Sequence, residues 1–363
     1  MALIKLNNRS SEDNAIHGRR NLIINGAMQV AQRGTSKTAT SAATYLLDRF
    51  MAYAGNYSNY GYTVSQTTDA PTGFSNSLKY NFDDADTSPA TEHSIYYRFE
   101  GQDLQNLKKG TASAESVTLS FWCKASLAGT YIVELMDVDN SNRHINKSYS
   151  ISSANTWEHK TITFEGDTTG TLTNDNSTSL DIAFWLAANS SNTSGTLQTS
   201  WGAISQANRA VGQTNLGATV NNAFYITGVQ LEVGTTTTPF EHRSYAEELS
   251  LCQRYYLLYV GDQSNAMVGV GDFWSATQVS AVMQFPTTMR ATPSMITENG
   301  GTNYYSAYSN SIEHTVSNAW TLFLPHKNGA SIYVTPNTNG TAGNAARIRT
   351  NVTSAYMAFD SEL

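Results

Sequence analysis

Short apolar and aromatic runs separated by polar turns recur along most of the chain. From Leu78 to Val233 they follow one another at intervals of roughly 8 to 15 residues, as strands of all-β folds do, and they include SVTLSFWCK, GTYIVELMD, WEHKTITFE and FYITGVQLEV. The first two have continuous apolar centres, which is typical of strands covered on both faces or central in a sheet. WEHKTITFE instead alternates, with Trp157 and His159 on one face and Ile162 and Phe164 on the other. Because no helical pattern lies between the runs, they predict an antiparallel sandwich.

The pattern changes period after Val233. A Gly-Thr run and Pro239 end the last strand, because glycine and proline interrupt a β ladder. From Ser244 the apolar positions fall at steps of four, three and four, on one face of a short helix: Tyr245, Leu249, Cys252 and Tyr256. The sequence therefore predicts a first domain over residues 21–243 and a connecting helix over 244–260.

Strand patterning resumes after this helix. TQVSAVMQF alternates, with Val279, Ala281, Met283 and Phe285 on one face, and further short runs such as AWTLFL and SIYVTP follow. Residues 261–363 therefore predict a second, smaller all-β domain of the sandwich class. Residues 1–20, MALIKLNNRSSEDNAIHGRR, show little periodicity and form an arm that is either a disordered tail or a docking segment.

Composition and charge argue against several classes of function. The net charge is -7, which argues against a nucleic-acid partner because phosphate binding needs a basic face. No apolar run approaches the roughly 20 residues that span a bilayer, so we expect no membrane insertion. LIINGAMQV lacks a convincing cleavage site for a signal peptide and reads better as a first strand, which indicates a protein kept in a cytoplasm until release.

No constellation of residues indicates catalysis, a cofactor or a metal. Cys123 and Cys252 read as buried free thiols, and the histidines lack zinc-ligand spacing. Asp137 begins an acidic turn without the glycine and distal glutamate of a calcium loop. Glu134 and Asp137 have the chemistry of a glycosidase pair, but no motif singles them out. We expect no enzymatic activity.

Aromatic residues offer candidates for ligand binding, since sugars stack on flat rings and hydrogen-bond to amides. Tyr304, Tyr305 and Tyr308 lie among asparagines in the second domain, and Trp201 lies in a polar loop of the first. The tyrosines could equally be buried in the sheet or between copies of the chain. Trp201 could equally anchor its loop.

Several sequence segments of the chain resemble segments of the tail-fibre and related virion fibre proteins of bacteriophages, particularly marine ones. They are NLIINGAMQVAQRG, YLLDRF, SFWCKAS, the stretch FYITGVQLEVGTTTTPFEHRSYAEELSLCQRYY, and FPTTMRATPSMI. The resemblance implies a jelly-roll first domain similar to carbohydrate-binding modules, a homotrimer, and adhesion to a glycan or protein of a bacterial surface. Some such fibres decorate the head or neck instead. Thr227 stands where calcium-containing jelly rolls of this kind often have Asp, and a hydroxyl is a poor ligand for a hard cation, so we predict no metal.

Pattern and resemblance together predict a structural virion fibre, an all-β protein with a jelly-roll sandwich, a connecting helix and a smaller C-terminal sandwich. We expect a tail fibre that adheres to the host and whose arm at residues 1–20 attaches to tail, baseplate or neck proteins. The helix face of Tyr245, Leu249, Cys252 and Tyr256 could pack beneath its own sandwich or against copies of itself, and the resemblance favours contact between chains. The alternatives are a head or neck decoration fibre, or a polysaccharide-degrading tail protein that uses Glu134 or Asp137.

Overall fold

The computed structural model describes residues 19–39, 41–55, 61–87, 89, 92–261, 263–297 and 303–363. They form two compact units. We call residues 19–29, Ser36–Thr44 and Phe50–Arg243 the sandwich unit, and Val30–Thr35, Tyr45–Arg49 and Ser244–Leu363 the terminal unit. Two early segments of the chain thus belong to the terminal unit, which the sequence pattern did not indicate. The predicted attachment arm lies almost wholly outside the described residues and stays a prediction.

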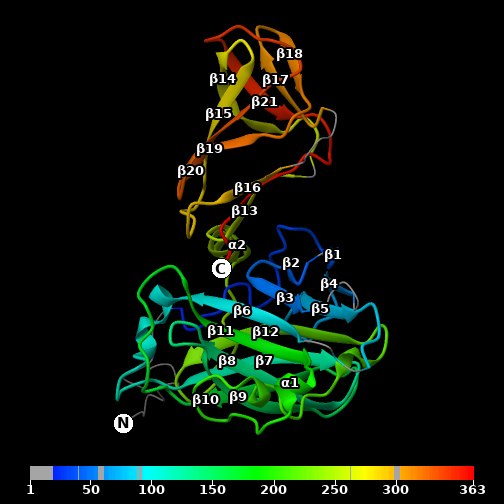
Figure 1. Ribbon diagram of the computed structural model, residues 1–363. Helices are drawn as coiled ribbons and strands as arrows, with labels where there is room; N and C mark the ends of the chain where they lie inside the picture. Colours follow the sequence, from blue (N-terminus) through cyan, green and yellow to red (C-terminus); the bar gives the residue numbers. More distant parts are fainter. Residues whose placement is uncertain are drawn as a thin grey trace, which may run out of the picture. The chain divides into compact units, whose positions relative to one another are not determined.

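The sandwich unit consists of two six-stranded antiparallel sheets (Figure 1). Sheet A has the order β1 (Ser36–Thr38), β4 (Tyr62–Thr67), β5 (Ser77–Phe82), β12 (Ala223–Val233), β7 (Val117–Ala125) and β10 (Glu158–Phe164). Sheet B has the order β2 (Ala43–Tyr45), β3 (Phe50–Ala54), β6 (His93–Glu100), β11 (Thr178–Ala187), β8 (Gly129–Asp137) and β9 (Arg143–Ile151). The short helical turns of this unit are η1 (Gly101–Leu107), α1 (Ser190–Thr193), η2 (Gln206–Asn208) and η3 (Leu216–Ala218).

Alternate residues of these strands build the core. Leu119, Phe121 and Cys123 of β7 are fully buried, and the Phe121 ring lies 5.1 Å from that of Phe184 in β11. On the outer face of sheet B, residues 188–214 cover the strands, so that Ile132 and Trp185 are buried there against Ala210. The all-β prediction is therefore confirmed, including the continuous apolar centre of β8. The prediction of a first strand in LIINGAMQV is wrong: residues 21–30 are irregular, with a turn in which the N–H of Met28 donates to the carbonyl of Asn25.

The terminal unit contains one helix and two further antiparallel sheets. The helix is α2 (Tyr245–Gln253), and its first turn is capped by the Ser244 hydroxyl, which accepts from the N–H of Glu247. Sheet C has the order β13 (Tyr256–Val260), β22 (Met357–Asp360) and β16 (Ser294–Thr297). Sheet D has the order β18 (Ile312–Val316), β17 (Tyr305–Ser309), β21 (Ala345–Thr350), β14 (Met267–Ser275), β15 (Gln278–Gln284), β20 (Gly329–Val334) and β19 (Thr321–His326).

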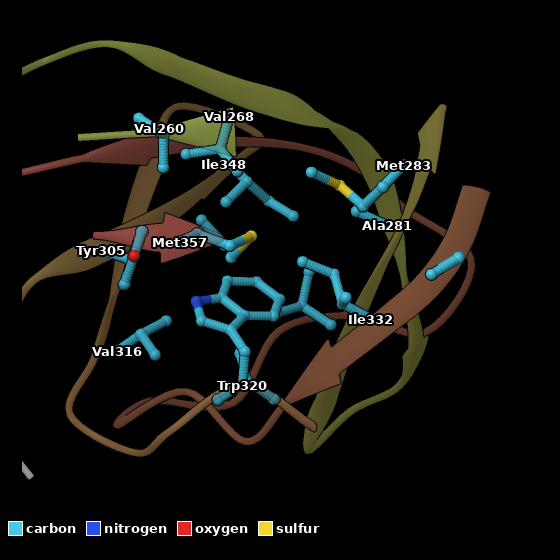
Figure 2. Close-up of a cluster of buried hydrophobic side chains, with 14 of the residues drawn as sticks. Val260, Val268, Ala281, Met283, Tyr305, Val316, Trp320, Ile332, Ile348 and Met357 are labelled. Atoms are coloured by element: carbon cyan, nitrogen blue, oxygen red, sulfur yellow. The ribbon is translucent and has the colours of Figure 1, made fainter. Parts of the chain in front are cut away.

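The terminal unit has a hydrophobic core of its own. Figure 2 shows the indole of Trp320 reaching into a cluster that contains Val316, Ile332 and Met357. The alternation predicted for β15 is confirmed, because Val279, Ala281 and Met283 are all buried in this cluster. Each unit therefore buries enough apolar surface to have its own core.

The predicted helix is shorter than the spacing suggested, and only the C-terminal part of its predicted apolar face is buried within the chain. It ends at Gln253, and Tyr256 is the first residue of β13. Cys252 and Tyr256 are fully buried, Leu249 is half-buried, and Tyr245 is exposed. Arg33 and Arg49, from the early segments of the terminal unit, stack on Tyr256 at 3.6 Å and on Tyr255 at 3.5 Å. Contact between chains through Cys252 and Tyr256 is therefore not available in this fold; their own chain occupies that surface.

Candidate functional site

A groove of about 420 Å³ lies on the outer face of sheet A. Its floor comes from β7 and β10, and its opposite wall comes from the loop that follows β12. The residues that line it are Ser120, Trp122, His159, Gly228, Thr237, Thr238, Pro239 and Phe240. The groove thus combines ring surfaces with hydroxyl groups.

Strand register brings the two floor residues together. Trp122 points outward because Phe121 and Cys123 on either side of it are in the core. In the β7–β10 ladder Trp122 lies directly opposite His159, and their ring centroids are 5.2 Å apart. Desolvation lowers the pKa of His159 below its usual 6.5, so its imidazole is neutral at pH 7. The floor therefore presents two uncharged aromatic rings.

A β-bulge in β12 positions the wall. The ladder to β7 shifts register between Thr227 and Gln230, and Gly228 within this bulge has φ +62°. A Cβ at Gly228 would lie 2.6 Å from Cζ of Phe74 and 3.1 Å from Cδ1 of Trp122. Phe74 in turn packs edge-on against Phe240, with ring centroids 5.0 Å apart. Glycine at this position therefore lets Phe74 support the wall ring.

The wall loop is held by buried side chains of β12. Glu232 accepts a hydrogen bond from the N–H of Thr238 at 3.0 Å and one from its hydroxyl at 2.5 Å. The side-chain oxygen of Gln230 accepts from the N–H of Glu241 at 2.8 Å. Gln230 and Glu232 are both buried, so these bonds are shielded from water. The groove is consequently formed before any ligand arrives.

A second pair of aromatic rings adjoins the groove on the same face of sheet A. Tyr225 lies opposite Lys124 in the β12–β7 ladder, and its ring centroid is 6.2 Å from that of Trp157. The ammonium of Lys124 lies 4.3 Å from the Tyr225 ring centroid and is ion-paired with Asp69. The indole N–H of Trp157 donates to Asp69 at 3.1 Å. We call Trp122, His159 and Phe240 together with Trp157 and Tyr225 the sheet A site.

Lys124 and Asp69 beside the sheet A site form an ion pair, and the ammonium of Lys79 lies 5.8 Å from the Tyr225 ring centroid. Burial by itself raises the pKa of Asp69, but hydrogen bonds from Lys124 and Trp157 outweigh it and lower that pKa below its usual value. The Lys124–Asp69 pair is therefore ionised at neutral pH and offers both donors and acceptors. No cluster of His, Cys, Asp or Glu able to hold a metal ion occurs among the described residues. Thr227 donates its hydroxyl to the carbonyl of Asn76 at 2.8 Å, a role that a carboxylate could not take.

The structure does not bring the three tyrosines suggested by the sequence together. Tyr305 points into the core, where its hydroxyl donates to the carbonyl of Tyr356 at 2.6 Å. Tyr304 is half-buried against the same core. Tyr308 faces outward from sheet D, with the guanidinium of Arg349 at 4.0 Å from its ring centroid. Residues three apart in a strand lie on opposite faces, so Tyr305 and Tyr308 cannot share a platform.

Trp201 lies apart from the sheet A site. Its indole N–H donates to the carbonyl of Glu165 at 2.7 Å, and the ammonium of Lys109 lies 5.4 Å from its ring centroid. Trp201 is half-buried. These contacts fit the alternative in which it anchors its loop.

The carboxylates considered for catalysis are buried in ion pairs. Glu134 is fully buried, and it contacts Arg209 at 2.7 Å and Nδ1 of His144 at 2.9 Å. Burial raises the pKa of Glu134, but its hydrogen bonds to His144 and Arg209 outweigh this and lower it, so the carboxylate is held ionised. Asp137 is buried beside Lys109 and accepts from the side chain of Asn140. Neither carboxylate has the exposed position that a glycan would need.

The sequence contained one signal for the sheet A site. The alternation of WEHKTITFE places Trp157 and His159 on the polar face of β10, where aromatic rings stay exposed. The partner ring Trp122 lies in a continuous apolar run, and the register that brings it to His159 is not encoded in either strand alone. Phe240 depends on the loop conformation, which the Thr run did not reveal.

Comparisons with known proteins give distant structural similarity only. No protein-family model matches the chain, and no curated protein matches it. The chain is similar in structure to the enzymatically active domain of bacteriophage CBA120 tailspike protein 4, with 12% identity and a TM-score of 0.31, over 59% of this chain and 21% of that one. It is also similar to the family 11 carbohydrate-binding module of Lic26A-Cel5E from Clostridium thermocellum, with 13% identity and a TM-score of 0.30, over 62% of this chain and 100% of that one. A third is the family 22 module with xylanase domain of Xyn10B from the same organism, with 7% identity and a TM-score of 0.32, over 62% and 30% of the two chains.

At these identities and TM-scores the similarity defines neither a family nor a ligand for the chain. In the part of the chain that the structure describes, no helix is long and apolar enough to cross a bilayer.

Proposed function

We propose that the chain is a structural fibre protein of a virion and that it binds a glycan of the bacterial host surface through the sheet A site. The observation that carries the binding proposal is the groove lined by the rings of Trp122, His159 and Phe240 together with hydroxyl-bearing residues. Sugar rings stack their C–H faces on aromatic rings and exchange hydrogen bonds at their rims. The groove offers both kinds of contact.

The charge pattern favours a neutral glycan. His159 is neutral, and Lys124 is already paired with Asp69. In the groove a carboxylated or sulfated sugar would therefore gain no free ion pair from these two groups. The ammonium of Lys79 lies beside Tyr225, outside the residues that line the groove. Hydroxyl groups, in contrast, can bridge the Lys124–Asp69 pair without displacing either charge.

The virion assignment rests on the phrases shared with phage fibre proteins, and it implies assembly in the host cytoplasm and release with the particle. The homotrimer and the attachment of residues 1–20 to tail, baseplate or neck proteins are further predictions of that resemblance. Mass photometry of the full chain tests the trimer, and cryo-electron microscopy of the virion tests the position. A location on the head or neck, together with failure of the recombinant protein to block adsorption, would favour the decoration role.

The binding test uses the full chain on immobilised capsular and O-antigen polysaccharides from candidate hosts. Trp122→Ala removes one ring surface, and we expect a loss of binding of at least about fivefold, since a stacked ring contributes roughly 1 kcal/mol or more. Trp201→Ala is the matched control, because its ring lies outside the site. Equal binding by wild type and Trp122→Ala, or a loss confined to Trp201→Ala, would refute the sheet A site.

A further inference from the structure

The outer face of sheet D is unusually apolar for a solvent-facing surface. Among the described residues, every exposed large hydrophobic side chain belongs to the terminal unit, with the exception of Val220. Val270 and Val282 are 64% and 66% exposed, and Met267 and Phe323 are 59% and 45% exposed. Soluble monomers rarely present contiguous apolar patches of this kind without a partner.

Ladder register joins these residues into one patch. Val270 of β14 and Val282 of β15 occupy facing positions two residues beyond the Asp272–Ser280 pair. Val282 lies opposite Ser331 of β20, and Ser331 lies opposite Phe323 of β19. On the other side of Val270 the register continues to Arg347 of β21 and then to Tyr308 of β17. The row therefore has an aliphatic centre at Val270 and Val282 and an aromatic ring near each end.

We propose that this face binds a second copy of the chain, with a two-fold axis running parallel to the strands between β14 and β15. Such an axis places β14 over β15 of the other copy, β21 over β20 and β17 over β19. Val270 then packs on Val282, Tyr308 on Phe323 and Arg347 on Ser331 of the other copy. No like charges face each other in this arrangement.

A projection and a hollow on the same face fit this axis. A groove of about 420 Å³ lies beside Val282, Gln284, Gly329 and His326. Met267 is one row from Val270 along β14, and the two-fold axis places it over Gln284 of the other copy. Methionine is flexible and fills irregular gaps well. Because each copy supplies one projection and one hollow, the face is complementary to itself.

The face that the axis pairs is close to the lower limit for a stable contact. Six strands about 4.8 Å apart, each about six residues long at about 3.3 Å per residue, give roughly 570 Å², because β18 has no counterpart across the axis. A standard interface buries about 800 Å² per partner. Pairing through the β19 edge is disfavoured, because β19 carries a bulge between Phe323 and His326 and contains Pro325. Aliphatic side chains at the centre of the patch also do not provide the ring faces or hydrogen bonds that a sugar needs.

The test measures the oligomeric state of the full chain by mass photometry and sedimentation velocity. We expect the wild type to pair through this face, as a dimer or, where the predicted homotrimer forms through other surfaces, as a hexamer. Val270→Asp and Val282→Lys should each lose this pairing, with dissociation constants raised roughly tenfold or more. An equimolar mixture of the two variants should regain dimers, because the introduced carboxylate of one copy would face the introduced ammonium of the other. Val220→Asp, at the exposed valine of the sandwich unit, is the control and should leave the dimer intact.

Unchanged thermal melting establishes that the variants fold, since all three positions are exposed. A wild type with the mass of a monomer or of an unpaired trimer overturns the proposal, and so does an assembly whose mass both substitutions leave unchanged. A wild type that does not pair, together with loss of polysaccharide binding by Val270→Asp, would assign the face to a ligand instead.

Discussion

At the scale of single residues, buried polar groups decide how the sandwich unit responds to pH. His93 in β6 is fully buried, and its Nδ1 shares a hydrogen bond of 2.9 Å with the hydroxyl of Tyr80. Asp86 lies 3.9 Å from the other ring nitrogen, yet desolvation dominates and lowers the pKa of His93 to about 4. The imidazole is therefore neutral in the folded protein.

Because the buried His93 is neutral, we predict that the free energy of unfolding decreases at acidic pH. Between pH 6.5 and about 4 the unfolded chain binds a proton at His93 and the folded chain does not, so the free energy of unfolding falls as the pH falls. The full effect is about 3 kcal/mol. His93→Gln should remove this part of the pH dependence while retaining a hydrogen-bonding group for Tyr80. Denaturant unfolding at pH 7 and pH 4 measures the difference.

The wild type at the same two pH values is the reference for this prediction. If His93→Gln and the wild type lose the same free energy between the two pH values, His93 is not the group responsible.

At the scale of elements, the amphipathic strands could be predicted and their partners could not. The alternation of Val279, Ala281 and Met283 gave β15 correctly, because one face of that strand is buried. The helix was predicted over 244–260, about two turns too long, because Tyr256 continues the helical spacing although it pairs with Asp360 in a sheet. The pattern of apolar residues does not show which strands pair. Tertiary contacts can therefore place a residue in a strand although its spacing fits a helix. The sheet A site depends on strand register and on a β-bulge. From the sequence, therefore, only its residues in the β10 segment could be recognised.

The bulge of β12 carries a prediction of its own. Gly228→Ala should destabilise the sandwich unit by about 1–3 kcal/mol, because the new methyl group meets Phe74 and Trp122 and because φ +62° is unfavourable for alanine. The same change should weaken glycan binding by displacing the two rings. Thermal melting and the polysaccharide assay measure the two effects.

The substitution Gly212→Ala separates the effect of backbone strain from the effect of steric crowding by the new methyl group. Gly212 has φ +88°, but a Cβ there would meet nothing within 4 Å. We expect it to cost only the backbone strain, about 1 kcal/mol, and to leave binding unchanged. Equal effects of the two substitutions on binding would mean that the bulge does not position the rings.

At the scale of the whole molecule, the terminal unit is not a simple C-terminal segment. Val30–Thr35 and Tyr45–Arg49 contribute charged and apolar side chains to it, although the main part begins only at Ser244. Leu46 and Leu47 are fully buried, and Arg49 pairs with Glu362 at 2.5 Å. A sequence pattern divides a chain into consecutive domains. It cannot show that an early segment of the chain belongs to a unit formed mainly by later residues.

A fragment of residues 244–363 should therefore be unstable although it contains the core around Trp320. It would lose the stacking of Arg33 and Arg49 on Tyr256 and Tyr255 and leave Glu362 without either arginine. An uncompensated buried charge costs about 3–5 kcal/mol, which is comparable with the total stability of a domain of this size. Circular dichroism and proton NMR should show a fragment with a poorly dispersed spectrum or a much lower melting temperature than the full chain. Addition of a peptide covering residues 28–55 should restore folding, because it returns both segments. A fragment that folds alone, with the full chain's melting behaviour, would show that these segments lie on the terminal unit without stabilising it.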